Sequence, residues 1–129
     1  MTAMQILGDP AQETLWQGRR LTLSGTVAGG RLPATRYRLT AATLYWTEGR
    51  LGTRTQQVPV WAIRDAVVSQ TVTQRARRVG TVTVSLQHVD YRGTPTFVLI
   101  EDVEKPRDVA KLINSSARSA RITHDASAG

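Results

Sequence analysis

Arginines in the segment "TQRARRVG" form the densest group of side chains with the chemistry to hold a ligand. Arg75, Arg77 and Arg78 fall close together between two predicted strands. A guanidinium group donates paired hydrogen bonds that fit phosphate oxygens, so this loop is a candidate site for an anion or a lipid headgroup. Arg50 and Arg54 flank another predicted hairpin and are further candidates for the same role. The alternative is a solvated basic loop without a specific ligand.

Residues suited to catalysis or metal binding are sparse. The chain has no cysteine and only two histidines, His88 and His124, the second in a predicted tail. A metal cluster or a serine-histidine triad would therefore lack partners. Carboxylates gather at Glu101, Asp102 and Glu104, before a predicted helix, where they suit a helix dipole better than hydrolysis. We expect no enzyme activity, no cofactor and no metal.

The charge balance narrows the class of partner. The chain carries 17 Lys and Arg residues against 10 Asp and Glu, a formal net charge of +7, and nearly all of the excess is arginine. A basic surface attracts phosphates, acidic lipid leaflets or acidic proteins, although a coding bias toward arginine would give the same composition. Nucleic acid is the least favoured partner, because aromatic residues make up only 5% of the chain.

Strand patterns fill most of the chain. The segment "GTVTVSL", from Gly80 to Leu86, alternates apolar and polar residues, which is typical of a half-buried strand. Turns rich in glycine and proline separate the segments. Similar patterns predict strands at Thr14 to Ser24, Thr35 to Thr40, Thr43 to Thr47, Arg54 to Val60, Asp65 to Val72 and Thr96 to Glu101.

The stretch "YRLTAATLYW" predicts scaffold rather than an active site. Tyr37 and Leu39 are expected to point toward the core, and Arg36 and Arg38 to point outward. A short turn from Pro59 to Ile63 joins two strands and ends on a core residue. Tryptophans at positions 16, 46 and 61 fall in or beside strand patterns, which favours packing over ligand stacking. The adjacent Arg64 and Asp65 point to opposite sides of a strand and cannot form one acid-base unit; we expect them to bond to the turn.

One helix pattern follows the strands, near Lys105 to Ala117. Val109, Leu112 and Ile113 recur at helical spacing, and Pro106 suits a first helical turn. We expect this helix to close the core by packing on the strand that contains Val82 and Val84.

Four blocks occur in a fixed order over most of Thr35 to Ile113: "YRLTAATLYWTEGRLG", "QQVPVWAIRDAVVSQT", "RRVGTVTVS" and "TFVLIEDVEKPRDVAKLI". In this order they resemble the bacterial pleckstrin-homology-like (PH-like) domains, a family often found in actinobacterial and other bacterial membrane proteins. The resemblance implies a mainly β fold, a PH-like β-barrel or roll of about seven strands capped by one C-terminal α-helix. We expect an N-terminal extension over residues 1–10, the PH-like domain over 11–117 and a flexible tail over 118–129.

Many members of the resembled family place two transmembrane helices before the "YRLT" block, where this chain has the fourteen residues "LTLSGTVAGGRLPA". Fourteen residues are too few for two spans. The start of the chain also lacks the basic and apolar segments of a secretion signal. We therefore expect a soluble, single-domain, cytoplasmic member of the family, with a peripheral position at a membrane as the alternative.

Two functions from different classes fit these patterns. One is a non-enzymatic binding module for protein-protein interaction or self-assembly, in which an exposed strand edge accepts an extended segment of an unknown partner or of a second copy. The other is peripheral binding to anionic lipid headgroups through the arginine-rich loops. Inositol-phosphate-binding relatives of the fold carry basic residues between their first two strands. Here that loop offers only Arg19, Arg20 and Arg31, whose spacing makes no specific motif.

Overall fold

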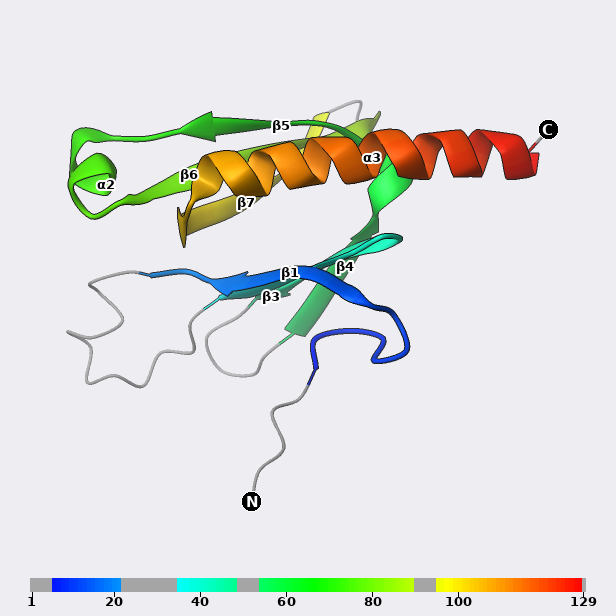
Figure 1. Ribbon diagram of the computed structural model, residues 1–129, viewed down its shortest axis with the longest axis horizontal. Helices are drawn as coiled ribbons and strands as arrows, with labels where there is room; N and C mark the ends of the chain where they lie inside the picture. Colours follow the sequence, from blue (N-terminus) through cyan, green and yellow to red (C-terminus); the bar gives the residue numbers. More distant parts are fainter. Residues whose placement is uncertain (1–5, 22–34, 49–53, 90–94, 129) are drawn as a thin grey trace, which may run out of the picture.

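The computed structural model describes residues 6–21, 35–48, 54–89 and 95–128. In these residues seven strands form two antiparallel sheets, and one long helix packs against them (Figure 1). The mainly β, PH-like fold is confirmed. The first sheet has the order β1 (Thr14–Arg19), β2 (Arg36–Thr40), β3 (Thr43–Glu48) and β4 (Arg54–Pro59), and the second has β5 (Ile63–Ser69), β6 (Val79–Val89) and β7 (Pro95–Glu104). Three helical segments complete the fold: η1 (Val60–Ala62), α2 (Val72–Ala76) and α3 (Pro106–Ala128).

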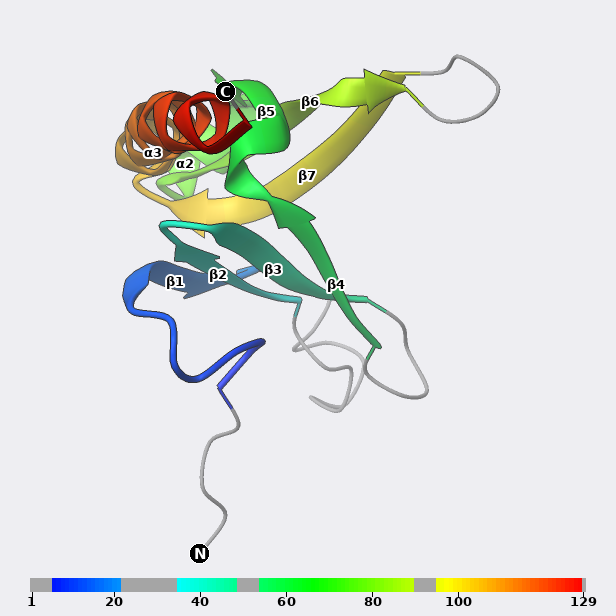
Figure 2. The same cartoon turned by 90° about the vertical axis from the view of Figure 1, so that its right-hand side faces the viewer.

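The core lies between the two sheets and α3. Side chains at alternate positions of each strand point inward, as the sequence pattern predicts. Val109 and Ile113 of α3 are buried with Val82 and Val84 of β6, and Leu112 is half-buried against the same cluster. The predicted closure of the core by the helix is therefore confirmed. The turn η1 carries the chain from the first sheet to the second (Figure 2), and the residue that follows it, Ile63, is fully buried as expected.

The end of α3 is not where the sequence pattern predicts it. The expected end near Ala117 is wrong, because the helix continues to Ala128 through most of the predicted flexible tail. Ala117 is itself buried, and one turn later Arg121 donates a hydrogen bond to the carbonyl oxygen of Ile63. Contacts with η1 and the start of β5 thus stabilise helical turns that composition alone does not identify.

Arg38 points outward from the core, as its strand position predicts, but its side chain is covered. The residue is only 3% exposed. The segment of residues 6–12 lies on the side of the first sheet away from the core (Figures 1 and 2) and covers Arg38. The guanidinium group donates to the carbonyl oxygens of Leu7 at 2.8 Å, Asp9 at 2.9 Å and Gln12, and its Nε donates to Thr14 Oγ1 at 2.7 Å. Strand alternation predicts the side of a residue but not what covers that side.

Candidate functional site

The arginine-rich segment between β5 and β6 is partly helical. Thr71 caps the N-terminus of α2, where its Oγ1 accepts a hydrogen bond from the backbone N–H of Gln74 at 3.1 Å. The Gln74 side chain returns the bond, because its Oε1 accepts from the backbone N–H of Thr71 at 3.0 Å. This capping box fixes the short helix despite its length.

The arginines of this segment differ in what they contact. Arg75 and Arg78 are exposed, whereas Arg77 is half-buried and donates a hydrogen bond to a backbone carbonyl just after β1. Arg54 is exposed but belongs to β4 of the other sheet, and the start of β4 lies away from α2 in both views (Figures 1 and 2). Arg50 lies outside the described residues. The structure therefore leaves Arg75 and Arg78 as neighbouring solvent-facing cations of the predicted anion site.

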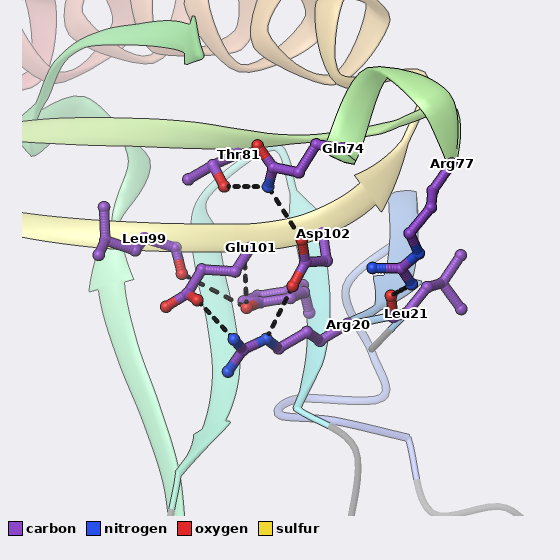
Figure 3. Close-up of polar contacts among 9 residues, drawn as sticks. Arg20, Leu21, Gln74, Arg77, Thr81, Leu99, Glu101 and Asp102 are labelled. Atoms are coloured by element: carbon purple, nitrogen blue, oxygen red, sulfur yellow. Dashed lines mark hydrogen bonds and ion pairs between the residues drawn. The ribbon is translucent and has the colours of Figure 1, made fainter. Parts of the chain in front are cut away.

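A polar network ties α2 and the end of β7 to the end of β1 (Figure 3). Arg20 pairs with Glu101 at 2.8 Å and with Asp102 at 3.2 Å. Asp102 also accepts a hydrogen bond from the Gln74 side chain at 2.9 Å, and Gln74 reaches Thr81 on β6 at the same distance. The two carboxylates, expected to suit a helix dipole, instead hold strands together. We interpret the network as structural.

Tyr37 joins the first sheet to the outer edge of β7. Its hydroxyl group donates to the carbonyl oxygen of Leu99 at 3.3 Å and accepts from the backbone N–H of Glu101 at 3.1 Å. Burial raises the pKa of the Tyr37 phenol above its ordinary value, because the phenolate would lose its hydration. The phenol is thus held in the protonated form that can donate to Leu99.

A groove of about 700 Å³ lies between β5 and α3. It is called the β5–α3 groove below. β5 is an edge strand of its sheet, and among the described residues no strand pairs with its outer edge. The residues that line this groove include Ala66 and Val68 on β5 and Arg107, Lys111, Asn114 and Arg118 on α3.

Asn114 bonds directly to the edge of β5. Its Oδ1 accepts from the backbone N–H of Ala66 at 2.8 Å, and its Nδ2 donates to the carbonyl oxygen of Ala66 at 3.0 Å. Both backbone groups of Ala66 therefore point away from β6. Since backbone direction alternates along an antiparallel strand, Val68 presents its N–H and C=O to the same side. The Asn114 amide makes the pair of bonds that one residue of an additional strand would make.

β5 and α3 run antiparallel beside each other along the groove. Asn114 contacts Ala66, and Arg121, seven residues later, contacts Ile63, three residues earlier in β5. Seven helical residues span about 10.5 Å and three strand residues about 10 Å, so the two elements stay in step. The open edge at Val68 consequently lies on the side of Asn114 toward the start of α3.

A second groove, of about 610 Å³, lies where the last turns of α3 pass η1 and the turn between β2 and β3. The ring of His124 stacks on Trp61, with ring centroids 3.9 Å apart and planes 5° apart. Trp61, like Trp16 and Trp46, packs half-buried against the core, which confirms the predicted packing role of the tryptophans. His124 was expected in a flexible tail and instead belongs to α3.

Comparison with known proteins identifies the family. The sequence model described as Bacterial PH domain matches residues 14–117. This chain belongs to the bacterial PH domain family. The match includes all seven described strands and α3 as far as Ala117. No curated protein and no solved structure matches the chain.

No helix among the described residues of this bacterial PH domain is both long and apolar enough to cross a membrane. Nor do they contain a group of three or more His, Cys, Asp or Glu side chains placed to hold a metal ion.

The sequence patterns did not predict the residues that line the helical wall of the β5–α3 groove as a binding site. Arg107, Lys111, Asn114 and Arg118 recur at intervals of four, three and four, which places them along one stripe of a helix. That stripe borders the apolar stripe that packs in the core. The spacing shows that the four residues share one face of the helix. It indicates a binding site only once the structure shows that this face borders the open edge of β5.

Proposed function

We propose that this bacterial PH domain is a non-enzymatic protein-interaction module that binds an extended segment of a partner along β5. The observation that supports this function is the pair of hydrogen bonds between Asn114 and Ala66 at an edge without a strand partner among the described residues. An added strand gains affinity from main-chain hydrogen bonds of the same kind. The bound segment replaces the Asn114 amide at Ala66 and pairs with the backbone of Val68.

The groove explains why a segment would bind here rather than at random. An exposed strand edge is prone to unspecific pairing, and proteins commonly cover or charge such edges. In this chain Asn114 covers one residue of the edge, and α3 runs beside the edge as the other wall of the groove. A partner must therefore be extended and must displace one side-chain amide.

The test begins with a library of random seven-residue peptides displayed on phage and selected on the immobilised protein. We expect selected peptides, resynthesised, to shift backbone amide NMR signals of β5 and of residues 107–118. Val68→Pro removes the N–H that faces the groove, and we expect it to abolish peptide binding. Val68→Thr keeps that N–H and the branched shape, so it serves as the matched control and retains binding.

Three results would refute the proposed function. One is a library that yields no peptide with measurable affinity for the protein. Another is a folded Val68→Pro variant, with an NMR spectrum of native dispersion, that binds the selected peptides as tightly as Val68→Thr does. Amide shifts confined to α2 or the first sheet would likewise place the site elsewhere.

A second candidate function is contact with an anionic membrane surface through α2. Val72 is 88% exposed, and the exposed guanidinium groups of Arg75 and Arg78 follow it. An exposed apolar side chain beside cations suits the interface of an acidic lipid leaflet, where each cation contributes about 1 kcal/mol. Co-sedimentation with vesicles that contain phosphatidylserine tests it. Binding that needs Arg75 and Arg78, and is absent with phosphatidylcholine vesicles, supports this candidate.

A further inference from the structure

We infer that the segment bound in the β5–α3 groove is acidic, with carboxylates at alternate positions that face α3. This inference rests on the proposed function, because it specifies the partner of the same site. The helical wall of the groove carries Arg107, Lys111 and Arg118, and among the described residues no acidic side chain lines the groove. All three cations are exposed, so carboxylates of a bound segment can reach them, and a segment without negative charge would offer them no partner.

Among the described residues, the two acidic side chains nearest in sequence to this groove do not line it. Asp108, on the same helix, lines a different groove beside β1. Asp65, on β5, is exposed and is not among the lining residues. The positive charge of the wall is therefore available to a ligand.

The spacing of the cations fits the repeat of an extended chain. Arg107 and Lys111 are four helical residues apart, which is about 6 Å along the axis. In a strand, side chains on one face repeat every two residues, or about 6.6 Å. Carboxylates at positions i and i+2 of the bound segment would thus meet Lys111 and Arg107 in turn. Arg118 lies about 10.5 Å beyond Lys111, on the far side of Asn114.

The shape of the site favours a peptide over a lipid surface. The cations line a groove whose other wall is the edge of a strand, and its backbone groups at Val68 face inward. A lipid surface could pair with the exposed cations but could not form strand hydrogen bonds with the backbone of Val68. An extended peptide satisfies both walls, with its backbone on β5 and its carboxylates on α3.

Three synthetic peptides test the inference by fluorescence anisotropy with the full chain. The first alternates valine with glutamate, VEVEVEV; the second has glutamine in place of each glutamate; the third, EEVVEVV, keeps the charge but has no two glutamates at positions i and i+2. Each exposed ion pair is worth roughly a two- to fivefold change in affinity, so for the pairs with Lys111 and Arg107 we expect VEVEVEV to bind about 4- to 25-fold more tightly than the glutamine peptide. We expect EEVVEVV to fall between them.

Charge reversal on the helix provides the matched protein variants. In the double variant Lys111→Glu and Arg118→Glu, we expect the preference for glutamate over glutamine to disappear. Arg19→Glu with Arg54→Glu changes the net charge by the same amount on exposed residues of the first sheet and is expected to keep the preference. A general electrostatic attraction would instead weaken equally in both double variants.

The outcomes separate this inference from the proposed function. Equal binding of the glutamate and glutamine peptides, with loss of both in Val68→Pro, would keep strand addition and overturn the acidic preference. Binding of none of the three peptides, when library-selected peptides of other composition bind the groove, would also overturn it. Capture by phosphatidylserine vesicles that depends on Lys111 and Arg118, without any peptide preference, would assign the cations to lipid and overturn it as well.

Discussion

Replacing Asn114 with aspartate isolates one hydrogen bond between α3 and the edge of β5. Asparagine both accepts from the N–H and donates to the C=O of Ala66, whereas an ionised aspartate can only accept. In Asn114→Asp, one oxygen keeps the bond to the N–H. The other takes the place of Nδ2, which lies 3.0 Å from the carbonyl oxygen, and the contact becomes repulsive.

The magnitude follows from the number of bonds. Asn114→Ala removes two neutral hydrogen bonds worth about 1 kcal/mol each, so we expect it to lower the free energy of unfolding by about 2 kcal/mol. Ala66 is only 6% exposed, which limits replacement of these bonds by water. For Asn114→Asp at neutral pH we expect a loss of about 2 to 3 kcal/mol, because the remaining bond is offset by repulsion between two oxygens and by desolvation of the carboxylate.

Urea unfolding, followed by tryptophan fluorescence at several pH values, measures these differences. Repulsion from the carbonyl raises the pKa of the new carboxyl group in the folded state above about 3.9, its value in the unfolded chain. The folded state then holds the proton more tightly, so the deficit of Asn114→Asp relative to Asn114→Ala is smallest below pH 4 and grows as pH rises. Ser115→Ala, at an exposed neighbouring position, is the control. An Asn114→Asp variant as stable as the original at pH 7 would refute the bond from Nδ2 to Ala66.

Three further predictions concern the core and the sheet contacts. Ile113→Ala is expected to lower the free energy of unfolding by about 2 to 5 kcal/mol, because the side chain is fully buried. Ile122→Ala, at a position that is 67% exposed, should change that free energy little. Equal effects of the two substitutions would contradict closure of the core by α3. Tyr37→Phe is expected to cost about 1 to 2 kcal/mol, and the raised pKa of Tyr37 gives a signature. The extra stability of the tyrosine protein over this variant should be complete below about pH 10, the ordinary pKa of the phenol, and should fall as pH rises through the higher folded pKa; a difference that stays constant to pH 11 would contradict it. Arg38→Met is expected to speed hydrogen exchange and proteolysis of residues 7–12, and unchanged rates would show that this segment is held by other contacts.

The local elements of this fold were predictable because their causes are local. Strict alternation in "GTVTVSL" and the helical spacing of Val109, Leu112 and Ile113 each record which side of an element is buried. The order of the four blocks then identified the PH-like arrangement. Turn boundaries were also close, since β5 begins at Ile63 rather than at the predicted Asp65.

Contacts between distant segments were not predictable from these patterns. Periodicity cannot show that Arg38 lies beneath residues 6–12, nor that the turns after Ala117 gain contacts with η1. It also cannot show that Asn114 bonds to a strand 48 positions earlier in the sequence. The candidate site depends on such contacts. The arginines in and just after α2 are close together in the sequence, whereas the cations of α3 are spread over twelve positions and come together only along one stripe of the helix.

Arg38 shows that the unit defined by homology and the unit that folds are not the same. The family match begins at residue 14, yet this buried cation takes its acceptors from the carbonyl groups of residues 7–12. An excised domain that starts at Thr14 would keep the charge and the Thr14 acceptor but lose the three carbonyl acceptors. Transplanting the domain into a fusion protein therefore requires the preceding segment as well. By the same reasoning, a relative without such a segment can bury arginine at this position only if another part of its chain supplies acceptors. We therefore expect the arginine at this position and the preceding segment to be inherited together.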